Sequence, residues 1–342
     1  TYSEAGLTQS KLWPPGTLCI TIAANIAETA LLTFPACFPD SVVGFTADPN
    51  KSDVRFIEYL FRAFRENVKR RAYGSVQENI NLEVLRNLSF PVPPLSKQKD
   101  IADFLTSFDD RITLLRETNA TLEAIAQALF KSWFVDFDPV RAKMAGRAPE
   151  GMDEATAALF PDSFEESELG VVPRGWHVAP LSSIATVIMG LSPKGDSYNS
   201  DGVGMPLING PVEFGDYFPV RTKWTTASER LANVGDLIFC VRGSTTGRRV
   251  VSDGDYCIGR GVCAIRAHNN HHGFLYQTIN FGLNRLLSKT TGSVFPSLSG
   301  PDITGFQVLV PEKSVVTAYE EGISPLIQQQ HSNQRQIETL TT

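Results

Sequence analysis

The apolar positions between residues 96 and 133 follow a heptad spacing that predicts one long helix. Steps of four and three residues alternate along the series Ile101, Leu105, Phe108, Ile112, Leu115, Leu122, Ala126, Leu129 and Trp133. Ser96 is suited to cap the first turn. A seam of this period is typical of a helix that packs on another helix. Asn119 occupies the seam itself, and a buried Asn at such a position often fixes register and partner.

A second and more polar seam lies near the end of the chain. It comprises Ile323, Leu326, Gln330, Asn333, Ile337 and Leu340. The step Ser324-Pro325 either starts a new helix, with proline in the first turn, or kinks a continuing one. We expect the two seams to pack on each other as an antiparallel coiled coil, with a globular head at each end. The alternative is that each helix packs on its own head.

The pattern in the rest of the chain predicts short strands and shorter helices. Alternation with a period of two predicts strands within 16–46. A helix is expected over 53–71, and a short terminal strand over 88–94, which prolines stop. The same order recurs later. We expect strands at 237–241 and within 250–266, a helix over 274–288 and a last strand at 306–311.

This recurrence is a duplication in the sequence itself. Three short matches lie about 218 positions apart: Gly16-Thr17-Leu18 with Gly235-Asp236-Leu237, Gly74-Ser75-Val76 with Gly292-Ser293-Val294, and Val92-Pro93 with Val310-Pro311. A repeat of this length indicates two tandem domains, because solenoid repeats are far shorter. The offset changes from 219 to 218, which places a one-residue difference most simply in the loop near 48–55.

The alignment of the copies also predicts the domain boundaries. The second copy opens with Pro173-Arg174-Gly175-Trp176, which the first lacks, and the second long helix stops opposite Ala124. We therefore expect a fragment or truncated product. Its expected parts are a first globular domain at 1–95, N-terminally incomplete, a long helix at 96–138, an acidic linker at 139–172, a second globular domain at 173–312 and the C-terminally incomplete start of a second long helix at 313–342.

Bulk composition narrows the class of protein. The 342 residues are 42% hydrophobic and 20% charged, and no apolar run approaches the length of a membrane span. The formal charge of −6 is unevenly placed, with acid concentrated between residues 136 and 168 and arginines gathered from 242 to 266. The five cysteines form no C-x-x-C pair, which favours free thiols in a reducing cytoplasm.

Several blocks of sequence resemble the specificity subunits of type I restriction-modification systems. The resemblance covers essentially the whole chain. Its blocks are residues 22–26, 36–45 and 90–95, then Phe130-Lys-Ser-Trp-Phe-Val-Asp-Phe-Asp-Pro139, then Pro161, Ser163, Glu168-Leu-Gly and Pro173-Arg-Gly-Trp176. The resemblance implies an α+β fold: two target recognition domains, each a small mixed β-structure with helices, separated by long helices that form an antiparallel coiled coil.

The same resemblance implies function and partners. Each recognition domain would read one half of a split site in double-stranded DNA, and the helices would act as a ruler between the half-sites. Methyltransferase (modification) subunits, expected to be two, and restriction subunits would be the protein partners. The chain itself would be non-catalytic and cytoplasmic, with S-adenosylmethionine, ATP and Mg on partner subunits. The alternative is a degenerate assembly protein that reads no DNA. A free-standing enzyme is disfavoured because no catalytic motif is present.

Candidate DNA contacts fall in the loop 242–249, in the loops 74–79 and 292–299 at equivalent places in the two copies, and at the basic end of the helix expected over 53–71. Glycines, hydroxyls and arginines suit phosphate and guanine, while Asn and Gln suit adenine. The candidates are Arg242, Ser244, Thr245, Thr246, Arg248 and Arg249; Lys289, Ser293, Phe295 and Ser297; Ser75, Gln77 and Asn79; and Lys69, Arg70 and Arg71. The loop 242–249 could equally be a generic phosphate loop or a plain hairpin, and the others could be variable surface loops. Lys69, Arg70 and Arg71 could instead offset a helix dipole.

The aromatic end of the long helix is the expected partner surface. Exposed aromatic side chains at a helix end mark docking sites. The candidates are Phe130, Trp133, Phe134 and Phe137. No metal-ligand spacing is present, and the histidines from 268 to 272 are expected to lie in a solvated turn.

Overall fold

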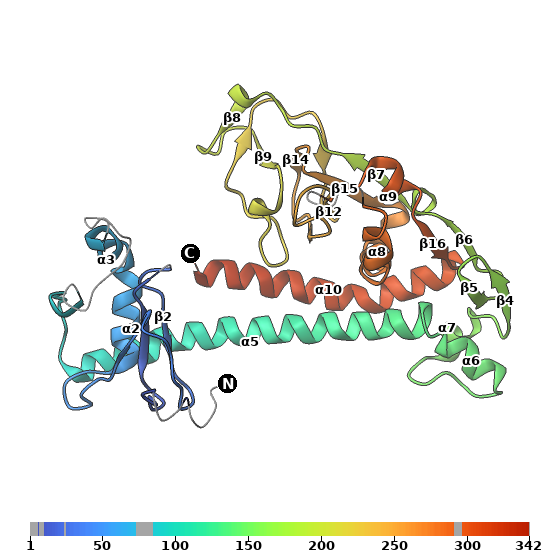
Figure 1. Cartoon of the computed structure of the whole chain (residues 1–342). Coiled ribbons are helices and arrows are strands. Elements are labelled where there is room, and N and C mark those ends of the chain that lie inside the picture. Colours follow the sequence, from blue (N-terminus) through green and yellow to red (C-terminus); the bar gives the residue numbers. More distant parts are fainter. Residues whose placement is uncertain (1–5, 7–9, 24, 73–84, 291–295, 342) are drawn as a thin grey trace. The chain divides into compact units, whose positions relative to one another are not determined.

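The computed structural model describes residues 6, 10–23, 25–72, 85–290 and 296–341, which form two compact units (Figure 1). The first unit covers residues 1–114 and the second covers Leu115–Thr341. A single long helix, α5 (Leu95–Phe134), contributes its first half to the first unit and its second half to the second. This helix has nearly the predicted bounds.

A three-stranded antiparallel sheet forms the centre of the first unit. The strands are β1 (Leu18–Thr21), β2 (Thr29–Leu31) and β3 (Val42–Phe45), in the order β2-β1-β3. Leu18 and Ile20 point into a core that Phe61 and Val68 complete from the helical side. The predicted helix over 53–71 is two helices, α2 (Val54–Ala63) and α3 (Arg65–Ala72), and the Asp53 side chain caps α2.

The first turns of α5 pack on the first head, the part of this unit that precedes α5. Gln98 is 1% exposed and bonds to the backbone of Asp53, and the Tyr59 hydroxyl donates to Asp109 at 2.9 Å. Ile101, which the heptad seam places on the buried face, is 39% exposed, while neighbouring Ala102 is fully buried. The seam prediction is therefore wrong at Ile101. Here the helix faces its own head, so the buried stripe is shifted by one residue.

Residues 88–94, expected as a strand, do not form one. The equivalent strand of the second copy forms by pairing with another strand. In the second unit β16 (Gln307–Val310) pairs with β6 (His177–Pro180). Among the described residues of the first unit no strand lies beside 88–94, so its backbone groups have no ladder to join.

The described residues of the second unit form two larger sheets and two strand pairs. One sheet has the order β13-β12-β15-β7, and the other has the order β11-β14-β9-β10-β8. The strands are β4 (Phe164–Ser167), β5 (Gly170–Pro173), β7 (Ala185–Met189), β8 (Tyr198–Asn199), β9 (Met205–Ile208), β10 (Trp224–Thr225), β11 (Leu231–Ala232), β12 (Leu237–Cys240), β13 (Arg249–Val251), β14 (Tyr256–Ile258) and β15 (Val262–Ala267). The helices are α6 (Asp138–Met144), α7 (Glu154–Ala158), α8 (His272–Leu287), α9 (Gly300–Thr304) and α10 (Lys313–Thr341). We call residues 173–312 the second head.

The duplication is visible in the strand geometry. β1 lies between β2 and β3 as β12 lies between β13 and β15, all antiparallel. Gly16 and Gly235 precede the two central strands with φ of +79° and +85°, a conformation that favours glycine. Leu18 pairs with Leu31 and Phe45, and Leu237 pairs with Val251 and Ile265. The offset thus rises from 219 to 220 within the sheet and falls to 218 later. A single length change near 48–55 is therefore wrong.

Residues 139–172, expected as an acidic linker, are folded. They carry most of α6 together with α7 and the β4–β5 hairpin, and Val140, Phe160 and Val172 are buried. Apolar side chains lie between the acidic ones along this segment and form its core. The charge of the segment alone does not predict this core.

The second half of α5 pairs with α10 in antiparallel fashion, as predicted. The Tyr319 hydroxyl donates to the carbonyl of Ala126 at 3.1 Å, and Asn333 Nδ2 donates to Asn119 Oδ1 at 2.8 Å. Position rises along α10 as it falls along α5, which defines the direction. Figure 1 shows α10 beside α5, with α8 of the second head lying against α10. Pro325 lies inside the continuous α10, so no new helix starts there.

Candidate nucleic-acid interface

The loop 242–249 connects β12 to β13 and is held by its own polar side chains. Thr246 Oγ1 donates to the carbonyls of Gly243 at 2.7 Å and Pro296 at 2.9 Å. Arg249 Nε donates to Asn280 Oδ1 at 2.6 Å, and burial lowers the pKa of Arg249. These internal bonds correct the expectation that the whole loop presents ligand-binding groups. The exposed side chains are Arg242, Ser244 and Arg248, while Thr245 is half-buried.

Two loops that the sequence marked separately meet in the structure. Arg242 forms an isolated antiparallel bridge with Ser297, and the Leu298 amide donates to the carbonyl of Val241 at 2.9 Å. Ser293 and Phe295 lie outside the described residues. Ser297 and Leu298 are therefore held against the start of the loop 242–249, which brings the predicted contact residues Arg242 and Ser297 together.

A polar groove of about 800 Å³ opens beside this surface. Arg242 lines it from one loop and Arg260 from another, with Ser192, Asn209 and Tyr198 completing the wall. Only Arg242 of these was a predicted site residue. The sequence signal for Arg260 was its place between Gly259 and Gly261, in a tight turn that joins two apolar strands.

The turn that carries Arg260 is packed so closely that glycine is required on both sides. A Cβ at position 259 would lie 1.8 Å from Asn209 Oδ1, and one at 261 would lie 2.1 Å from the Asn209 carbonyl oxygen. The Arg260 amide donates to Ser192 Oγ at 3.1 Å, and the Val262 amide donates to the Gly259 carbonyl, also at 3.1 Å. The backbone of Arg260 is thus fixed while its side chain is exposed.

The arginines of the second head divide into two groups. Arg266 bonds to buried Asp236, which raises the pKa of Arg266, and Arg221 bonds to the Tyr256 hydroxyl and to Asp253. By contrast, within the described part of the chain no hydrogen bond or ion pair engages the guanidinium groups of Arg242 and Arg260. A groove lined by two such cations is suited to an anionic ligand, since both can bind oxygen atoms without breaking an internal contact.

The remaining predicted contacts are dispersed. Lys69 pairs with Glu66 at 3.5 Å near the end of α3, Arg70 beside it is exposed, and Arg71 lies in the same last turns. Ser75, Gln77 and Asn79 lie outside the described residues. Lys289 is exposed after α8, with its Nζ 5.7 Å from the centre of the Phe306 ring. These residues stay predictions.

The aromatic end of α5 is interior, not surface. Phe130, Trp133 and Phe134 are 4%, 8% and 6% exposed, and they pack around Tyr319 of α10. Phe137 is half-buried, with its ring centre 6.0 Å from that of Trp176. The expectation that these four side chains form an exposed surface is wrong, because the chain folds back after α5 and covers them with α10 and the second head.

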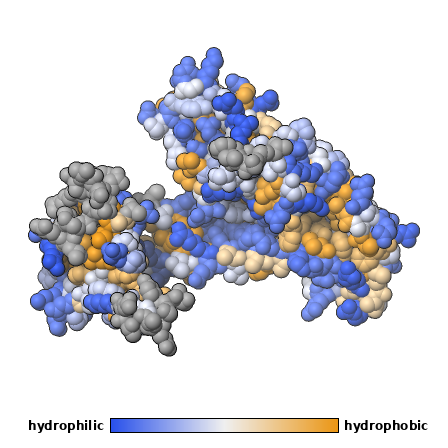
Figure 2. All heavy atoms as spheres, viewed as in Figure 1, coloured by the Kyte–Doolittle hydropathy of each residue, from blue (hydrophilic) through white to orange (hydrophobic). Residues whose placement is uncertain are grey.

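An open apolar groove of about 550 Å³ lies beside this cluster. Val135, Val171 and Phe281 on its rim are 42%, 53% and 43% exposed, and Arg141 and Arg285 add positive charge. Figure 2 shows apolar residues gathered at the surface of this end of the second unit. The buried side chains of Phe130 and Phe134 also line the groove.

Other chemistry is limited among the residues whose structure is described. No three His, Cys, Asp or Glu side chains there are placed to hold a metal ion. In the same residues no helix is long and apolar enough to cross a membrane. Cys263 is fully buried, which raises the pKa of its thiol.

Comparison with known proteins identifies the type of domain. The family model described as type I restriction modification DNA specificity domain matches residues 1–124 and again residues 173–342. The MjaX type I restriction enzyme specificity subunit of Methanocaldococcus jannaschii is 26% identical over 305 residues, which are 85% of this chain and 66% of that protein. The HindI specificity subunit of Haemophilus influenzae is 31% identical over 221 residues, 51% of this chain and 48% of that protein.

A solved structure supports the same architecture. The type I restriction-modification system S subunit from M. genitalium matches with a TM-score of 0.56 at 17% identity, covering 97% of this chain and 81% of that one. This likeness concerns the fold. The chain spans about two thirds of the length of the MjaX relative and about half of the HindI relative.

Proposed function

The chain belongs to the type I restriction modification DNA specificity family, and we propose that its second head reads one half of a split DNA site through the groove between Arg242 and Arg260. The observation that carries this proposal is that two exposed arginines from separate loops, Arg242 and Arg260, line one polar groove. Duplex DNA carries closely spaced phosphates, and arginine can bond both phosphate and the paired acceptors of guanine.

The first head would read the other half-site. It repeats the central strand arrangement of the second head, and α3 ends in the basic residues Lys69, Arg70 and Arg71. The antiparallel pair of α5 and α10 would set the gap between half-sites. The chain would act without catalysis of its own, alongside modification subunits that bind S-adenosylmethionine and restriction subunits that use ATP and Mg.

Modification subunits would dock at the apolar groove between Val135, Val171 and Phe281. Its exposed apolar rim is costly to leave in water, and Arg141 and Arg285 beside it fit a partner segment that combines apolar and acidic side chains. This proposal keeps the predicted location but replaces the buried aromatics with the surface above them.

Salt-dependent DNA binding tests the reading groove. Each phosphate contact contributes about −0.9 to the slope of log affinity against log salt concentration. We expect Arg242→Ala and Arg260→Ala each to weaken binding, with a shallower slope wherever the lost contact is to phosphate. Arg174→Ala, an exposed arginine outside the groove, is the matched control.

Methylome mapping with the modification subunits present tests the two-headed reading. A split recognition motif is the expected result. An unsplit motif, or a slope near zero for the unaltered chain, would contradict the proposal and favour a degenerate assembly protein that reads no DNA. Turnover by the isolated chain with S-adenosylmethionine or ATP would favour a free-standing enzyme instead.

A further inference from the structure

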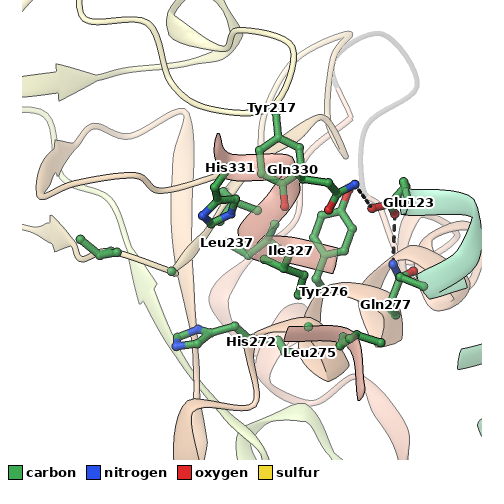
Figure 3. Close-up of a pocket in the computed structure, with 16 residues that line it drawn as sticks. Glu123, Tyr217, Leu237, His272, Leu275, Tyr276, Gln277, Ile327, Gln330 and His331 are labelled. Atoms are coloured by element: carbon green, nitrogen blue, oxygen red, sulfur yellow. Dashed lines mark hydrogen bonds between the residues drawn. The ribbon is translucent and has the colours of Figure 1, made fainter. Parts of the chain in front are cut away.

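The joint between the second head and the helical pair is only partly packed. A cavity of about 230 Å³ lies there, lined by Leu237 of the head, Tyr276 of α8 and Ile327 of α10, with Tyr217 entering from a loop (Figure 3). Close-packed interiors contain few voids of this size. Apolar contact alone therefore constrains the head weakly on this side of the joint.

One carboxylate joins three helices at the edge of the cavity. Glu123 of α5 accepts a hydrogen bond from Gln277 Nε2 of α8 at 3.0 Å and a longer one from Gln330 Nε2 of α10 at 3.5 Å (Figure 3). Gln277 and Gln330 are 2% and 3% exposed. Hydrogen bonds to a charged acceptor are strong when they are shielded from water, and they are directional, unlike apolar contact.

From Glu123 the polar contacts continue outward to the reading loop. Asn280 Nδ2 donates to Gln277 Oε1 at 3.4 Å, and Arg249 Nε donates to Asn280 Oδ1 at 2.6 Å. Arg249 also donates to the carbonyl of Gly247 at 3.0 Å, which closes the loop that begins at Arg242. A continuous chain of side chains thus runs from the helical pair to the loop 242–249, whose first residue, Arg242, lines the groove.

From Glu123 the contacts also continue into the seam. Gln330 Nε2 donates to the carbonyl of Asn119 at 3.1 Å, and Asn333 Nδ2 donates to Asn119 Oδ1 at 2.8 Å. The same network therefore fixes the register of α5 against α10 and the position of the second head on both.

We infer that Glu123 is a positioning residue for DNA reading: it holds the loop 242–249 at one place on the helical pair, and so fixes the distance at which the second half-site is read. The inference rests on the proposed reading of a split site. The helical pair can fix the spacing between half-sites only if the second head keeps one orientation on it. Because Glu123 lies far from the groove in the hydrogen-bond chain, its loss should leave the bases that are read unchanged and broaden the accepted spacing.

The test uses the full chain with its modification subunits and a DNA library. The library carries the two half-sites found by methylome mapping, separated by the native spacer or by one or two base pairs more or fewer. We expect Glu123→Ala to raise methylation at the wrong spacers about tenfold relative to the native spacer, on the scale of one lost charged hydrogen bond. Glu123→Gln retains one acceptor for Gln277 and should recover most of the discrimination.

Two further variants make the result decisive. Asn280→Ala interrupts the chain between Arg249 and Gln277 without touching the helical pair, and it should also broaden spacing if Glu123→Ala fails to fold. Glu117→Ala, an exposed carboxylate on the same helix, is the control that should keep the native profile.

The outcomes distinguish the positioning role of Glu123 from the proposed reading of a split DNA site. A native spacing profile in folded Glu123→Ala and in Asn280→Ala would overturn the positioning role, and so would altered half-site bases. Absence of methylation at any split site by the unaltered complex would instead overturn the proposed function itself.

Discussion

Half-buried Asn119, which pairs with buried Asn333, offers a direct measure of how polar groups shape the helical pair. Its side-chain oxygen accepts from Asn333 Nδ2 at 2.8 Å, and its Nδ2 donates weakly to the carbonyl of Gln330 at 3.4 Å. Asn333 is 2% exposed. Replacing Asn119 with Leu leaves the Asn333 donor without this acceptor inside a protein interior.

The expected cost follows from that stranded donor. A buried donor that loses its partner costs about 1–3 kcal/mol, so Asn119→Leu should lower the free energy of unfolding by about 2 kcal/mol. For a unit of this size this corresponds to a fall in Tm of roughly 4–8 °C. Chemical unfolding of the chain, followed by circular dichroism, measures the free energy directly.

The double variant Asn119→Leu with Asn333→Leu separates this explanation from simple disruption. Replacing both partners with apolar groups removes the stranded donor, so much of the stability should return, although register would be less strictly fixed. A single variant as stable as the unaltered chain would refute the cost assigned to the stranded donor. A double variant destabilised by the sum of the two single changes would refute it equally.

Three other predictions concern separate features of the second unit. Gly235→Ala places a Cβ 2.8 Å from the His272 ring at φ +85° and should destabilise the unit by about 1–2 kcal/mol in thermal unfolding; an unchanged Tm would contradict the close packing. Burial raises the pKa of Glu320 to about 7 from its ordinary 4.5, so the folded state binds the extra proton and this group's contribution to stability falls as pH rises from about 4.5 to 7. Glu320→Gln should flatten that loss in unfolding titrations, and an identical pH profile would argue against it. Val171→Asp should reduce co-purification with the modification subunit while Val203→Asp, equally exposed elsewhere, should not; equal effects would exclude the apolar groove as the dock.

The elements most reliably predicted were those with a strong internal period. The heptad spacing predicted α5 almost to the residue, because a helix of that length repeats its signal many times. The repeated Gly-x-Leu predicted two equivalent central strands, and both glycines adopt the left-handed conformation that such a residue permits. Prediction was weaker where a partner decides the outcome. Residues 88–94 have strand-like composition, but a strand forms only beside another strand.

The candidate site was predicted only in part, for a similar reason. The sequence marked the loop 242–249 as basic but could not sort Arg242 from Arg249, since that depends on whether Asn280 lies within reach of the guanidinium. Arg260 was passed over because the other arginine that lines the groove, Arg242, comes from a separate loop. The four aromatics at the end of α5 looked like a surface because nothing local to them indicates what covers them.

The sequence by itself determined the duplication, through short matches at one offset, and the first long helix, through periodic apolar positions that local backbone geometry must satisfy. Only the tertiary structure decided which polar side chains face a ligand and which hold the protein together. Arginine, asparagine and glutamate carry the same chemistry in either role. What separates the roles is the distance to a partner tens or hundreds of residues away, as for Glu123 with Gln277 and Asn119 with Asn333.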